Sequence, residues 1–503
     1  MRYISYLFIL FTLLLVSSCR EDFKFEPSTG NLEFSRDTVY LDTVFTNIGS
    51  STYTLKVYNR SKKNIKIPTL RLGQSENSKY RLMVDGMPGK VFHDVELLAR
   101  DSMFIFIETT IDYDDYVNSE TSFLYTDQII FGTESQHQKV ELVTLVQDAV
   151  FLYPQRFDNG EYEGLPIEGS DDTIYGFYLD ENDPTNGNEL IWTNQKPYVV
   201  YGYAAVPSGK TLQIQEGAKV HFHDGSGIIV AQNGAIQAEG TLENPIIFEG
   251  DRLEPYFSDV PGQWSTIWMT SGSAPSSIKN AVIKNSTIGL YVQNCELELE
   301  NVQIYNASNF GILATTATIN AFNVAINNAG QSSLACTIGG HYDFTHCTIA
   351  NYWNRSHRSL PALILDNTYE TSEGIKPLWA KFENCIVYGA NNMELSINKA
   401  ENSNFEFSFD YSLIKFIDTM NRFANDPLYD FANSTLYDNS IIAKNFNNNK
   451  VDFVNTAKND LRILETSAAK GTANSNYSGT RDILGNLRSG QIDMGAYNFV
   501  VLD

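Results

Sequence analysis

The sequence predicts an all-β chain in which an N-terminal β-sandwich is followed by a parallel β-solenoid. Three observations support this. The first 150 residues carry short alternating strands without a helical period, an eight-residue pattern recurs further along, and aromatic residues make up 13% of the chain. A strand pattern that recurs about every 22 residues indicates one coil per repeat, with neighbouring coils stacked on a shared core.

The first 18 residues are predicted to form a signal peptide. Arg2 precedes an apolar run from residue 4 to residue 16, which is too short to span a bilayer. Residues 16–19 resemble a bacterial lipobox, and this implies cleavage before Cys19, which would carry the lipid. An ordinary secretory signal is the alternative. Residues 20–22 are similar to the export tag of surface lipoproteins of the Bacteroidetes, so the resemblance implies an outer-membrane lipoprotein that is exposed at the surface. Retention in the periplasm stays open, and residues 19–33 would form the tether.

Residues 34–150 are expected to form the sandwich. Candidate strands lie at residues 38–45, 53–58, 103–107, 128–131 and 140–146, with polar or Gly-bearing turns between them. Residues 42–49 and 55–59 resemble immunoglobulin-like modules of the abnormal-spindle-related kind. That resemblance implies a spacer role.

Residues 151–194 are rich in Asp, Glu, Gly, Asn and Pro, and are interpreted as an acidic linker. Its run from Asp180 to Asp183 would be compatible with calcium, but Thr185 and Ile191 stand where an EF-hand loop needs Gly and Glu. A solvated loop is favoured. No cofactor is implied, and calcium remains possible without a motif.

The solenoid is predicted over residues 195–425. Its octets are residues 278–285, 299–306, 321–328, 344–351, 382–389 and 408–415. The third octet position holds Asn280, Asn301, Asn323, His346, Asn384 and Asp410, and the sixth holds Ile283, Ile304, Ile326, Ile349, Val387 and Leu413. The sixth position should point into the core. The octets end on Asn285, Asn306, Asn328 and Asn351 in four copies, which predicts a ladder of turns, because Asn tolerates the left-handed region.

Residues 426–503 are expected to cap the last coil, because the period fades there. Residues 482–488 and 492–497, taken with the octets, resemble right-handed parallel β-helix proteins related to pectate lyases. This resemblance implies a right-handed parallel β-helix over roughly residues 195–503. Cys295, Cys336, Cys347 and Cys385 could form disulfides in an exported chain, but octet positions favour buried thiols for Cys347 and Cys385.

The charge balance excludes some partners. The chain carries 60 acidic and 36 basic residues, for a net charge of -24. Nucleic acid is therefore not an expected partner, and neither is unaided docking on anionic lipid. The expected partners are a membrane, through the lipid anchor, and a polysaccharide. The sequence does not define an oligomeric state.

The best candidate for chemistry is a set of polar residues in one coil and its insertion. Polygalacturonase-like hydrolases carry Asn-Thr-Asp, His-Gly and Arg-x-Lys runs that residues 195–425 lack. The candidate catalytic residues are His341, Asp343, Arg355, His357, Arg358 and Asp366. A His base, an Arg that binds a uronate and an Asp acid would suit a lyase or hydrolase. The competing interpretation is structural, because His346 in the same coil occupies the Asn position of the octet.

Exposed aromatic rings offer a second route to sugar binding. Tyr352 and Trp353 in the insertion are the candidate ligand-binding residues, while Trp264 is expected to be buried at a coil corner. The leading hypothesis is a non-catalytic envelope lipoprotein that binds a glycan, or acts as a scaffold, through one β-helix face. The alternative is a polysaccharide lyase or glycoside hydrolase that acts on an extracellular glycan.

Overall fold

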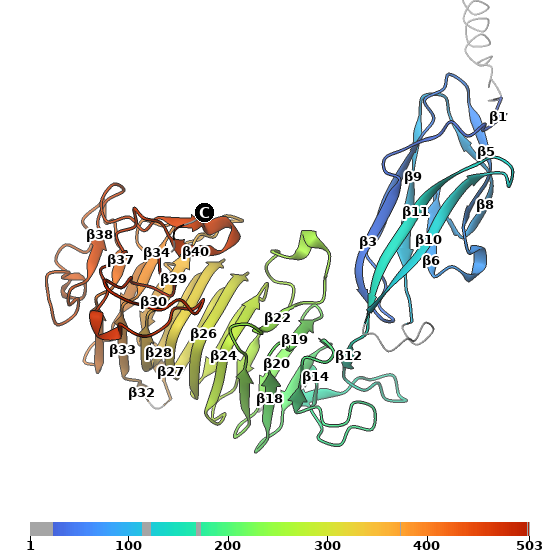
Figure 1. The fold of residues 1–503 in the computed structure, drawn as a ribbon. Coiled ribbons are helices and arrows are strands. Elements are labelled where there is room, and N and C mark those ends of the chain that lie inside the picture. The colour runs from blue at the N-terminus through green and yellow to red at the C-terminus, as the bar shows by residue number, and fades with distance from the viewer. Residues whose placement is uncertain (1–23, 113–121, 167–172, 373, 500, 502–503) are drawn as a thin grey trace, which may run out of the picture. The chain divides into compact units, whose positions relative to one another are not determined.

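The computed structural model describes residues 24–112, 122–166, 173–372, 374–499 and 501. The chain divides into two compact units, Met1–Asp148 and Ala149–Asp503 (Figure 1). Apart from single 3-10 turns, the regular structure of the described residues consists of strands. No helix in these ranges is long and apolar enough to cross a membrane. The predicted signal peptide and Cys19 lie outside the described residues.

The N-terminal unit is a sandwich of two sheets around one core. One sheet contains β1 (Glu26–Pro27), β3 (Thr38–Phe45), β5 (Ile65–Leu72), β8 (Val91–Leu97), β10 (Ser122–Gly132) and β11 (His137–Gln147). The other contains β2 (Glu33–Phe34), β4 (Tyr53–Tyr58), β6 (Tyr80–Val84), β7 (Met87–Gly89) and β9 (Ser102–Thr109), and η1 (Ser75–Asn77) is a turn before β6. Alternate residues of the strands, such as Leu55, Ile105 and Leu142, are fully buried between the sheets.

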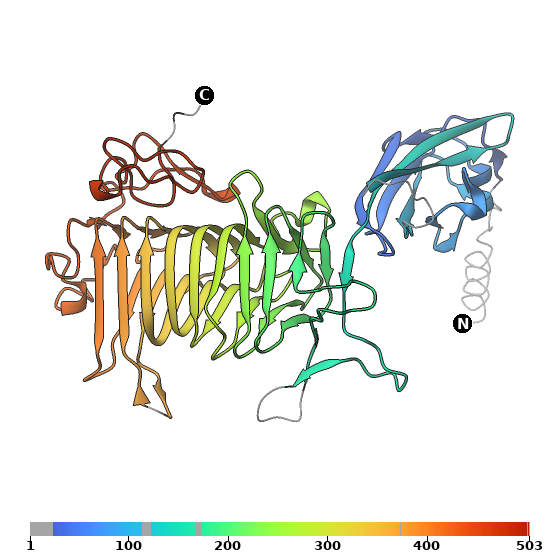
Figure 2. The ribbon, with the colours of Figure 1, turned by 60° about the horizontal axis from the view of Figure 1, so that its bottom comes forward.

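The second unit is a stack of coils whose strands pair in parallel with the coils before and after them (Figure 2). The pairings form three series, here named sheet 1, sheet 2 and sheet 3. Sheet 1 contains β14 (Thr173–Tyr178), β17 (Tyr203–Val206), β20 (Gly227–Val230), β23 (Ile267–Met269), β25 (Ile288–Gln293), the first parts of β27 (Phe310–Ala329) and β28 (Ser332–Thr345), β30 (Leu363–Asp366) and β35 (Leu395–Asn398).

Sheet 2 contains β15 (Ile191–Trp192), β18 (Thr211–Gln215), β21 (Ala235–Glu239), the first parts of β24 (Ser276–Lys284) and β26 (Glu296–Ala307), the middle of β27, the end of β28, β33 (Leu378–Glu383) and β36 (Phe405–Asp410). Sheet 3 contains β12 (Val150–Leu152), β16 (Tyr198–Val200), β19 (Lys219–Phe222), β22 (Ile246–Gly250), the ends of β24, β26 and β27, β29 (Thr348–Asn351), β34 (Ile386–Gly389), β37 (Leu413–Lys415) and β38 (Ile441–Ala443). The predicted fold class, an all-β chain with a sandwich before a parallel β-helix, is confirmed.

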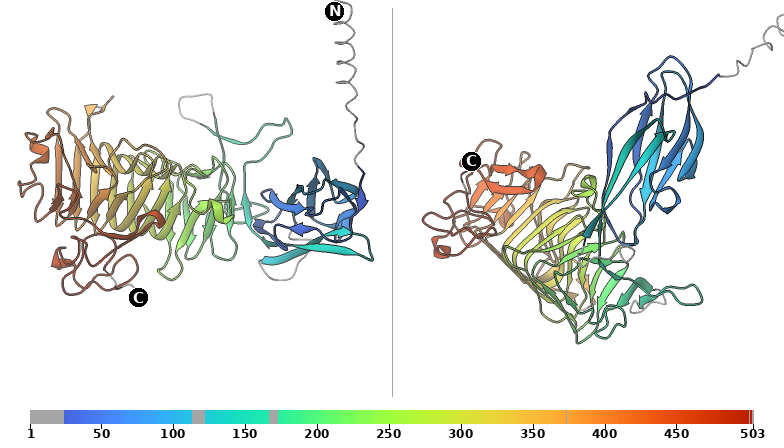
Figure 3. Two further views of the ribbon diagram at one scale, coloured as in Figure 1. Left: turned by 90° about the horizontal axis from the view of Figure 1, so that it is seen from above. Right: turned by 45° about the vertical axis from the view of Figure 1, so that its right-hand side comes forward.

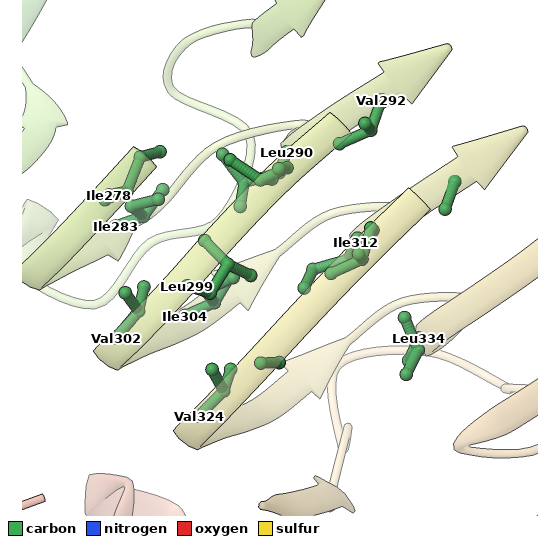
Figure 4. Close-up of a cluster of buried hydrophobic side chains, with 14 of the residues drawn as sticks. Ile278, Ile283, Leu290, Val292, Leu299, Val302, Ile304, Ile312, Val324 and Leu334 are labelled. Atoms are coloured by element: carbon green, nitrogen blue, oxygen red, sulfur yellow. The ribbon is translucent and has the colours of Figure 1, made fainter. Parts of the chain in front are cut away.

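The core of the solenoid runs through all coils. Ile283, Ile304, Ile326 and Ile349 are fully buried and lie opposite one another in successive coils, as the sixth octet position predicted. Figure 4 shows Ile304 with Leu299, which belongs to the same strand β26, and with Ile312 of β27, and these side chains turn toward the same interior. A coil of this size cannot bury its own apolar face, so stacking supplies the burial.

Asn ladders mark two corners of the coil. Asn301 Nδ2 donates to Asn280 Oδ1 at 3.0 Å, and Asn323 Nδ2 donates to Asn301 Oδ1 at 2.8 Å. At the next corner Asn306 Nδ2 donates to Asn285 Oδ1 at 3.2 Å. These residues have φ values between 48° and 66°, the left-handed region that Asn tolerates. Asn351 departs from the predicted ladder, because its side chain instead bonds the backbone of Ala329.

The last octet is shifted by one residue from its predicted register. Tyr411, with φ 48°, stands one residue before Ser412, whose hydroxyl accepts the Cys385 N–H at 3.0 Å. Ile386 pairs with Leu413, so Tyr411 and not Asp410 is the equivalent of Asn384. The octet of this coil is therefore 409–416.

The acidic segment at residues 151–194 is not a linker. Its strands β12, β14 and β15 pair in parallel with β16, β17 and β18, and Trp192 is fully buried. Only β13 (Gly164–Pro166) lies outside this pattern, in an antiparallel pair with β14. These residues form the first coil, and the polar composition belongs to its turns. Asp180 and Asp183, weighed for calcium, accept the backbone N–H groups of Asn182 and Thr185 in their own loop.

The C-terminal segment, residues 444–499, lies along the flank of the solenoid (Figures 2 and 3). It contains β39 (Phe453–Asn455), β40 (Asp460–Ile463), η5 (Thr456–Lys458) and η6 (Ser475–Tyr477). Leu461, Ile483 and Tyr497 pack against Tyr305, Ala325 and Ala350 on the outer face of sheet 3. The region before it, with η4 (Pro427–Tyr429) and Tyr437, packs on the core of the last coils, whereas Val451, Ile463 and Met494 of the segment pack on Ile386 and Leu413 of sheet 3. The prediction that residues 426–503 form one end cap is thus wrong for the C-terminal segment.

All four cysteines of the described residues are free thiols. Cys336, Cys347 and Cys385 are buried, and Cys295 is partly buried. Burial raises the pKa of the Cys295 thiol to about 11, so this thiol stays protonated at neutral pH.

Candidate functional site

The outer face of sheet 2 brings polar and aromatic side chains into three rows along the solenoid. Residues of a strand alternate between its two faces, so every second residue of these strands points outward. The first row holds Glu296, Thr318, His341, Trp379 and Glu406. The second row holds Glu298, Asn320, Asp343, Lys381 and Ser408, and the third row holds Glu300, Phe322, Thr345, Glu383 and Asp410. Neighbouring members of a row stand on strands about 4.8 Å apart.

A hollow of ≈ 270 Å³ opens on this face. Its lining includes Glu298, Glu300 and Asp343, together with the rings of Phe322 and Tyr477. Carboxylates accept hydrogen bonds from hydroxyl groups, and rings offer flat apolar contact, so the hollow has the chemistry of a sugar-binding surface.

The C-terminal segment forms one wall of this face. Tyr477 Oη donates to Glu383 Oε2 at 2.9 Å, and Asn474 Nδ2 donates to Glu383 Oε1 at 2.9 Å. Burial works to raise the pKa of Glu383, but hydrogen bonds from Lys381, Tyr477 and Asn474 outweigh it and hold this pKa below its ordinary value. Glu383 is therefore a charged carboxylate that holds the C-terminal segment against sheet 2.

The first row carries the most exposed ring of the site. The centroids of the His341 and Trp379 rings are 6.3 Å apart, and Trp379 is 37% exposed. On the same side, the hairpin of β31 (Glu370–Thr371) and β32 (Gly374–Ile375) precedes β33 in the chain. His341, Asp343 and Trp379 thus lie on one face.

The remaining candidate catalytic residues lie on other sides of the coil. Arg355, His357 and Arg358 follow β29 of sheet 3, and Asp366 ends β30 of sheet 1. Asp366 accepts hydrogen bonds from Thr368 and Asn398, and an Nη2 donor of Arg355 bonds the carbonyl oxygen of Asp259 at 2.6 Å. The predicted single cluster of His341, Asp343, Arg355, His357, Arg358 and Asp366 does not form, because its members lie on sheet 2, in the loop after sheet 3 and at the end of a sheet 1 strand.

Arg358 is part of a buried ion pair. Its Nη2 donates to Glu394 Oε1 at 2.6 Å and its Nη1 donates to Glu394 Oε2 at 2.9 Å. The side chains are 2% and 0% exposed. A bidentate pair without solvent access holds the insertion to the next coil and cannot receive a uronate.

The candidate ligand-binding residues of the insertion are partly buried. Tyr352 packs edge-on against Phe453 of the C-terminal segment with ring centroids 6.0 Å apart, and burial raises the pKa of Tyr352. Trp353 Nε1 donates to Ser356 Oγ at 2.9 Å within its own loop. Both side chains are partly exposed, so the binding roles of Tyr352 and Trp353 stay predictions. Trp264 is buried, as expected.

His346 is a structural member of the corner ladder. It is fully buried with φ 52°, its Nδ1 lies 3.3 Å from the Gly495 carbonyl oxygen, and Asn384 Nδ2 lies 3.0 Å from its Nε2. Burial, aided by the nearby Arg488 guanidinium, lowers the pKa of His346 to about 3. The structural interpretation of this histidine is supported.

A larger hollow, ≈ 670 Å³, lies near the C-terminal end of the coils among Phe416, Phe423 and Phe431. Two of its carboxylates accept hydrogen bonds from the backbone of nearby turns. Asp418 accepts the Phe423 N–H, and Asp426 accepts the Leu428 N–H. We therefore place the functional site on sheet 2. Among the described residues, no three His, Cys, Asp or Glu side chains converge in a way that could hold a metal ion.

Sequence reasoning missed Glu298, Glu300, Phe322 and Tyr477. The first three had a signal: residues 296–300, 318–322, 341–345, 379–383 and 406–410 alternate in front of the turn position of each coil. Extending the octets toward the N-terminus would have found the rows. Tyr477 had no such signal, because only folding of the C-terminal segment brings it to the hollow.

Comparisons with known proteins give limited likenesses. Residues 184–287 match the model of a pectate-lyase like beta helix domain. No curated protein matches the sequence. A family 123 glycoside hydrolase from Clostridium perfringens aligns with 11% identity and a TM-score of 0.15 over 24% of this chain, and the match spans only 26% of that hydrolase. The catalytic unit of a GH87 alpha-1,3-glucanase from Streptomyces thermodiastaticus aligns with 11% identity and a TM-score of 0.21 over 71% of this chain and 79% of that chain.

The match to the beta helix domain agrees with the strand pairings on architecture. The matched segment covers the coils from β15 to β24, in which every strand pairs in parallel with the coil before or after it. The second unit is a parallel β-helix solenoid, and its residues 184–287 are similar to the pectate-lyase like beta helix domain.

Proposed function

We propose that the protein is a non-catalytic envelope lipoprotein that binds a glycan along the outer face of sheet 2. The observation that carries this proposal is the row arrangement itself. Exposed Trp379 and His341, the hydrogen-bonding side chains of the second row and the wall at Tyr477 line one continuous face. Such a face suits a chain of sugar rings that lies along the solenoid axis.

Two further points support a glycan and a non-catalytic role. The likeness of residues 184–287 to a pectate-lyase like domain favours a carbohydrate ligand. The acid, base and Arg set expected for catalysis is dispersed, with Arg358 in a buried ion pair and Asp366 at the end of a sheet 1 strand. Geometry for attack on one glycosidic bond requires these groups to converge.

Trp379→Ala tests the binding face. We expect glycan affinity to fall about tenfold, because an aromatic contact contributes about 0.5–1.5 kcal/mol beyond its buried area. Calorimetric titration with the best oligosaccharide of a glycan array would measure the loss. Trp353→Ala tests the competing location in the insertion, and if the glycan binds on sheet 2 this variant should bind like the unaltered protein. Unchanged affinity of Trp379→Ala, or a loss confined to Trp353→Ala, would move the site off sheet 2.

A glycoside hydrolase is the second candidate function. Glu298 and Asp343 line one hollow and stand two strands apart, so their backbones are about 9.6 Å from each other. Inverting hydrolases place two carboxyl groups about 6.5–9.5 Å apart. Shorter oligosaccharides released by the unaltered protein, but not by Glu298→Gln or Asp343→Asn, would establish this candidate over simple binding.

We place the protein at the outer membrane, exposed at the cell surface, with a lipid on Cys19. The sandwich would act as an immunoglobulin-like spacer between membrane and solenoid. The sequence before residue 24 supports this proposal through its apolar run and its single Cys.

Cys19→Ala is expected to release the protein into the soluble fraction, because the variant has no thiol for the lipid. Membrane fractionation after a salt wash measures the shift, and Cys295→Ala is the control that keeps the lipid site. Membrane association that survives in Cys19→Ala would reject the anchor. Protease treatment of intact cells separately reports surface exposure.

A further inference from the structure

We infer that the sheet 2 face selects glycans that carry free amino groups and rejects polyuronates. This inference rests on the proposed function, because it names the ligand class of the same face. This ligand class differs from the acidic polysaccharide that similarity to a pectate-lyase like domain would suggest.

The hollow carries negative charge. Glu298, Glu300 and Asp343 line it, and its described lining contains no Lys or Arg. Glu298 is exposed, so its charge faces solvent. Glu298 and Asp343 stand on strands about 9.6 Å apart, and this separation is comparable to the screening length of about 8 Å at physiological ionic strength. A uronate ring in the hollow would bring a further carboxylate among them.

Lys279 and Lys381 offset only part of this charge, because the three rows hold seven carboxylates, at Glu296, Glu298, Glu300, Asp343, Glu383, Glu406 and Asp410. Lys279 Nζ lies 3.6 Å from Glu298 Oε1, and Lys381 Nζ lies 2.7 Å from Glu383 Oε2. Glu383 also accepts the hydrogen bonds of Tyr477 and Asn474, so Lys381 is held at the wall. The rows continue with Glu296 and Glu406 at exposed positions, which extends the negative potential along the solenoid.

A protonated amino sugar fits this arrangement. Its ammonium group would pair with Glu298 or Glu300, and its ring face would lie against Phe322 or Tyr477. Bridging a uronate to these carboxylates would instead need divalent cations, and no metal-binding triad of His, Cys, Asp or Glu occurs among the described residues. The face therefore favours amino-sugar polymers over neutral ones, and neutral ones over polyuronates.

The experiment compares four hexamers by calorimetric titration of the full-length protein. They are a β-linked glucosamine hexamer, its N-acetylated form, a neutral glucan hexamer and a galacturonate hexamer, the last with and without calcium. We expect the glucosamine hexamer to bind tighter than its N-acetylated form by between about twofold and thirtyfold, since each exposed ion pair adds a small increment. The advantage should shrink in high salt, whereas galacturonate should not bind without calcium.

Glu298→Gln/Glu300→Gln should abolish the difference in affinity between the glucosamine hexamer and its N-acetylated form, because the ammonium group loses its carboxylate partners. Glu134→Gln/Glu243→Gln removes the same charge from two exposed loop positions and should keep the preference. If this control also lost the preference for free amino groups, the net charge of the protein and not the hollow would explain the preference, and the inference would be wrong. Binding of galacturonate without calcium would also overturn the inference, but it would leave the proposed function of glycan binding standing. Failure of every hexamer and of a wider glycan array would instead reject the proposed function.

Discussion

Glu394→Gln is expected to destabilise the solenoid by about 3–5 kcal/mol. The substitution leaves the Arg358 guanidinium charged, buried and without its carboxylate, and breaking a buried pair in this way has a cost of that size. Burial raises the pKa of Glu394, while Arg358 and the N–H groups of Asn391 and Ala362 stabilise its charged form. Urea unfolding followed by circular dichroism at pH 7 would give the loss of free energy.

Two variants make this prediction specific to the pair. Glu465→Gln removes an exposed carboxylate that pairs with Lys470 at 2.6 Å and should change stability by less than about 1 kcal/mol. Arg358→Met/Glu394→Leu replaces both charges with apolar groups of similar volume and should recover part of the stability, because neither charge is then left unpaired, although the N–H groups of Asn391 and Ala362 lose their acceptor. A loss below about 1 kcal/mol in Glu394→Gln would mean that solvent reaches the pair.

The same pair explains why Arg358 was misinterpreted from the sequence. An Arg in an insertion, close to two His residues, has the composition of a binding loop. Its partner Glu394 lies 36 residues later, outside any octet, and nothing in the local pattern joins them. Sequence periodicity reports which residues share a position in successive coils, but it does not report which insertion folds onto which coil.

Local periodicity did predict the core and the corners. Ile304 and Ile326 are predicted inside because the sixth octet position is apolar in every copy, and Asn306 and Asn328 are predicted at turns because Asn tolerates the left-handed region. The shift of the last octet arose because Tyr411 takes the left-handed position, which is unfavourable for a bulky residue. Long-range folding escaped prediction: the contact between Tyr305 and Tyr497 joins residues 192 positions apart, and no repeat encodes it.

His346→Asn is expected to remove a large part of the acid sensitivity of the protein. The hydrogen bonds assign the neutral tautomer, in which Nδ1–H donates to the Gly495 carbonyl and Nε2 accepts from Asn384. Protonation would place a second donor opposite the Asn384 amide. Rotation of that amide is opposed because its Oδ1 accepts the Asn474 N–H at 2.7 Å. The folded protein therefore keeps His346 neutral.

The sign of the pH effect follows from the two pKa values. The pKa of His346 is about 3 in the folded protein and 6.5 in the unfolded chain. Below pH 6.5 only the unfolded chain takes up the proton, so stability falls as the pH decreases toward 3. At pH 4 this linkage amounts to about 3 kcal/mol relative to pH 7.

Asn is the informative replacement because neighbouring coils already use it. Asn323 donates to Asn301 Oδ1 and to the Arg481 carbonyl, which is the same pairing with the ladder and the C-terminal segment. We expect His346→Asn to match the unaltered protein at pH 7 within about 1 kcal/mol and to exceed its stability by about 3 kcal/mol at pH 4. Urea unfolding gives the free energy of unfolding of both proteins at pH 7 and pH 4. Subtracting the change of one protein from that of the other removes the contribution of the carboxylates, which both proteins share. Equal acid dependence of the two proteins would show that His346 is protonated in the folded state, and the buried ladder would then need another explanation.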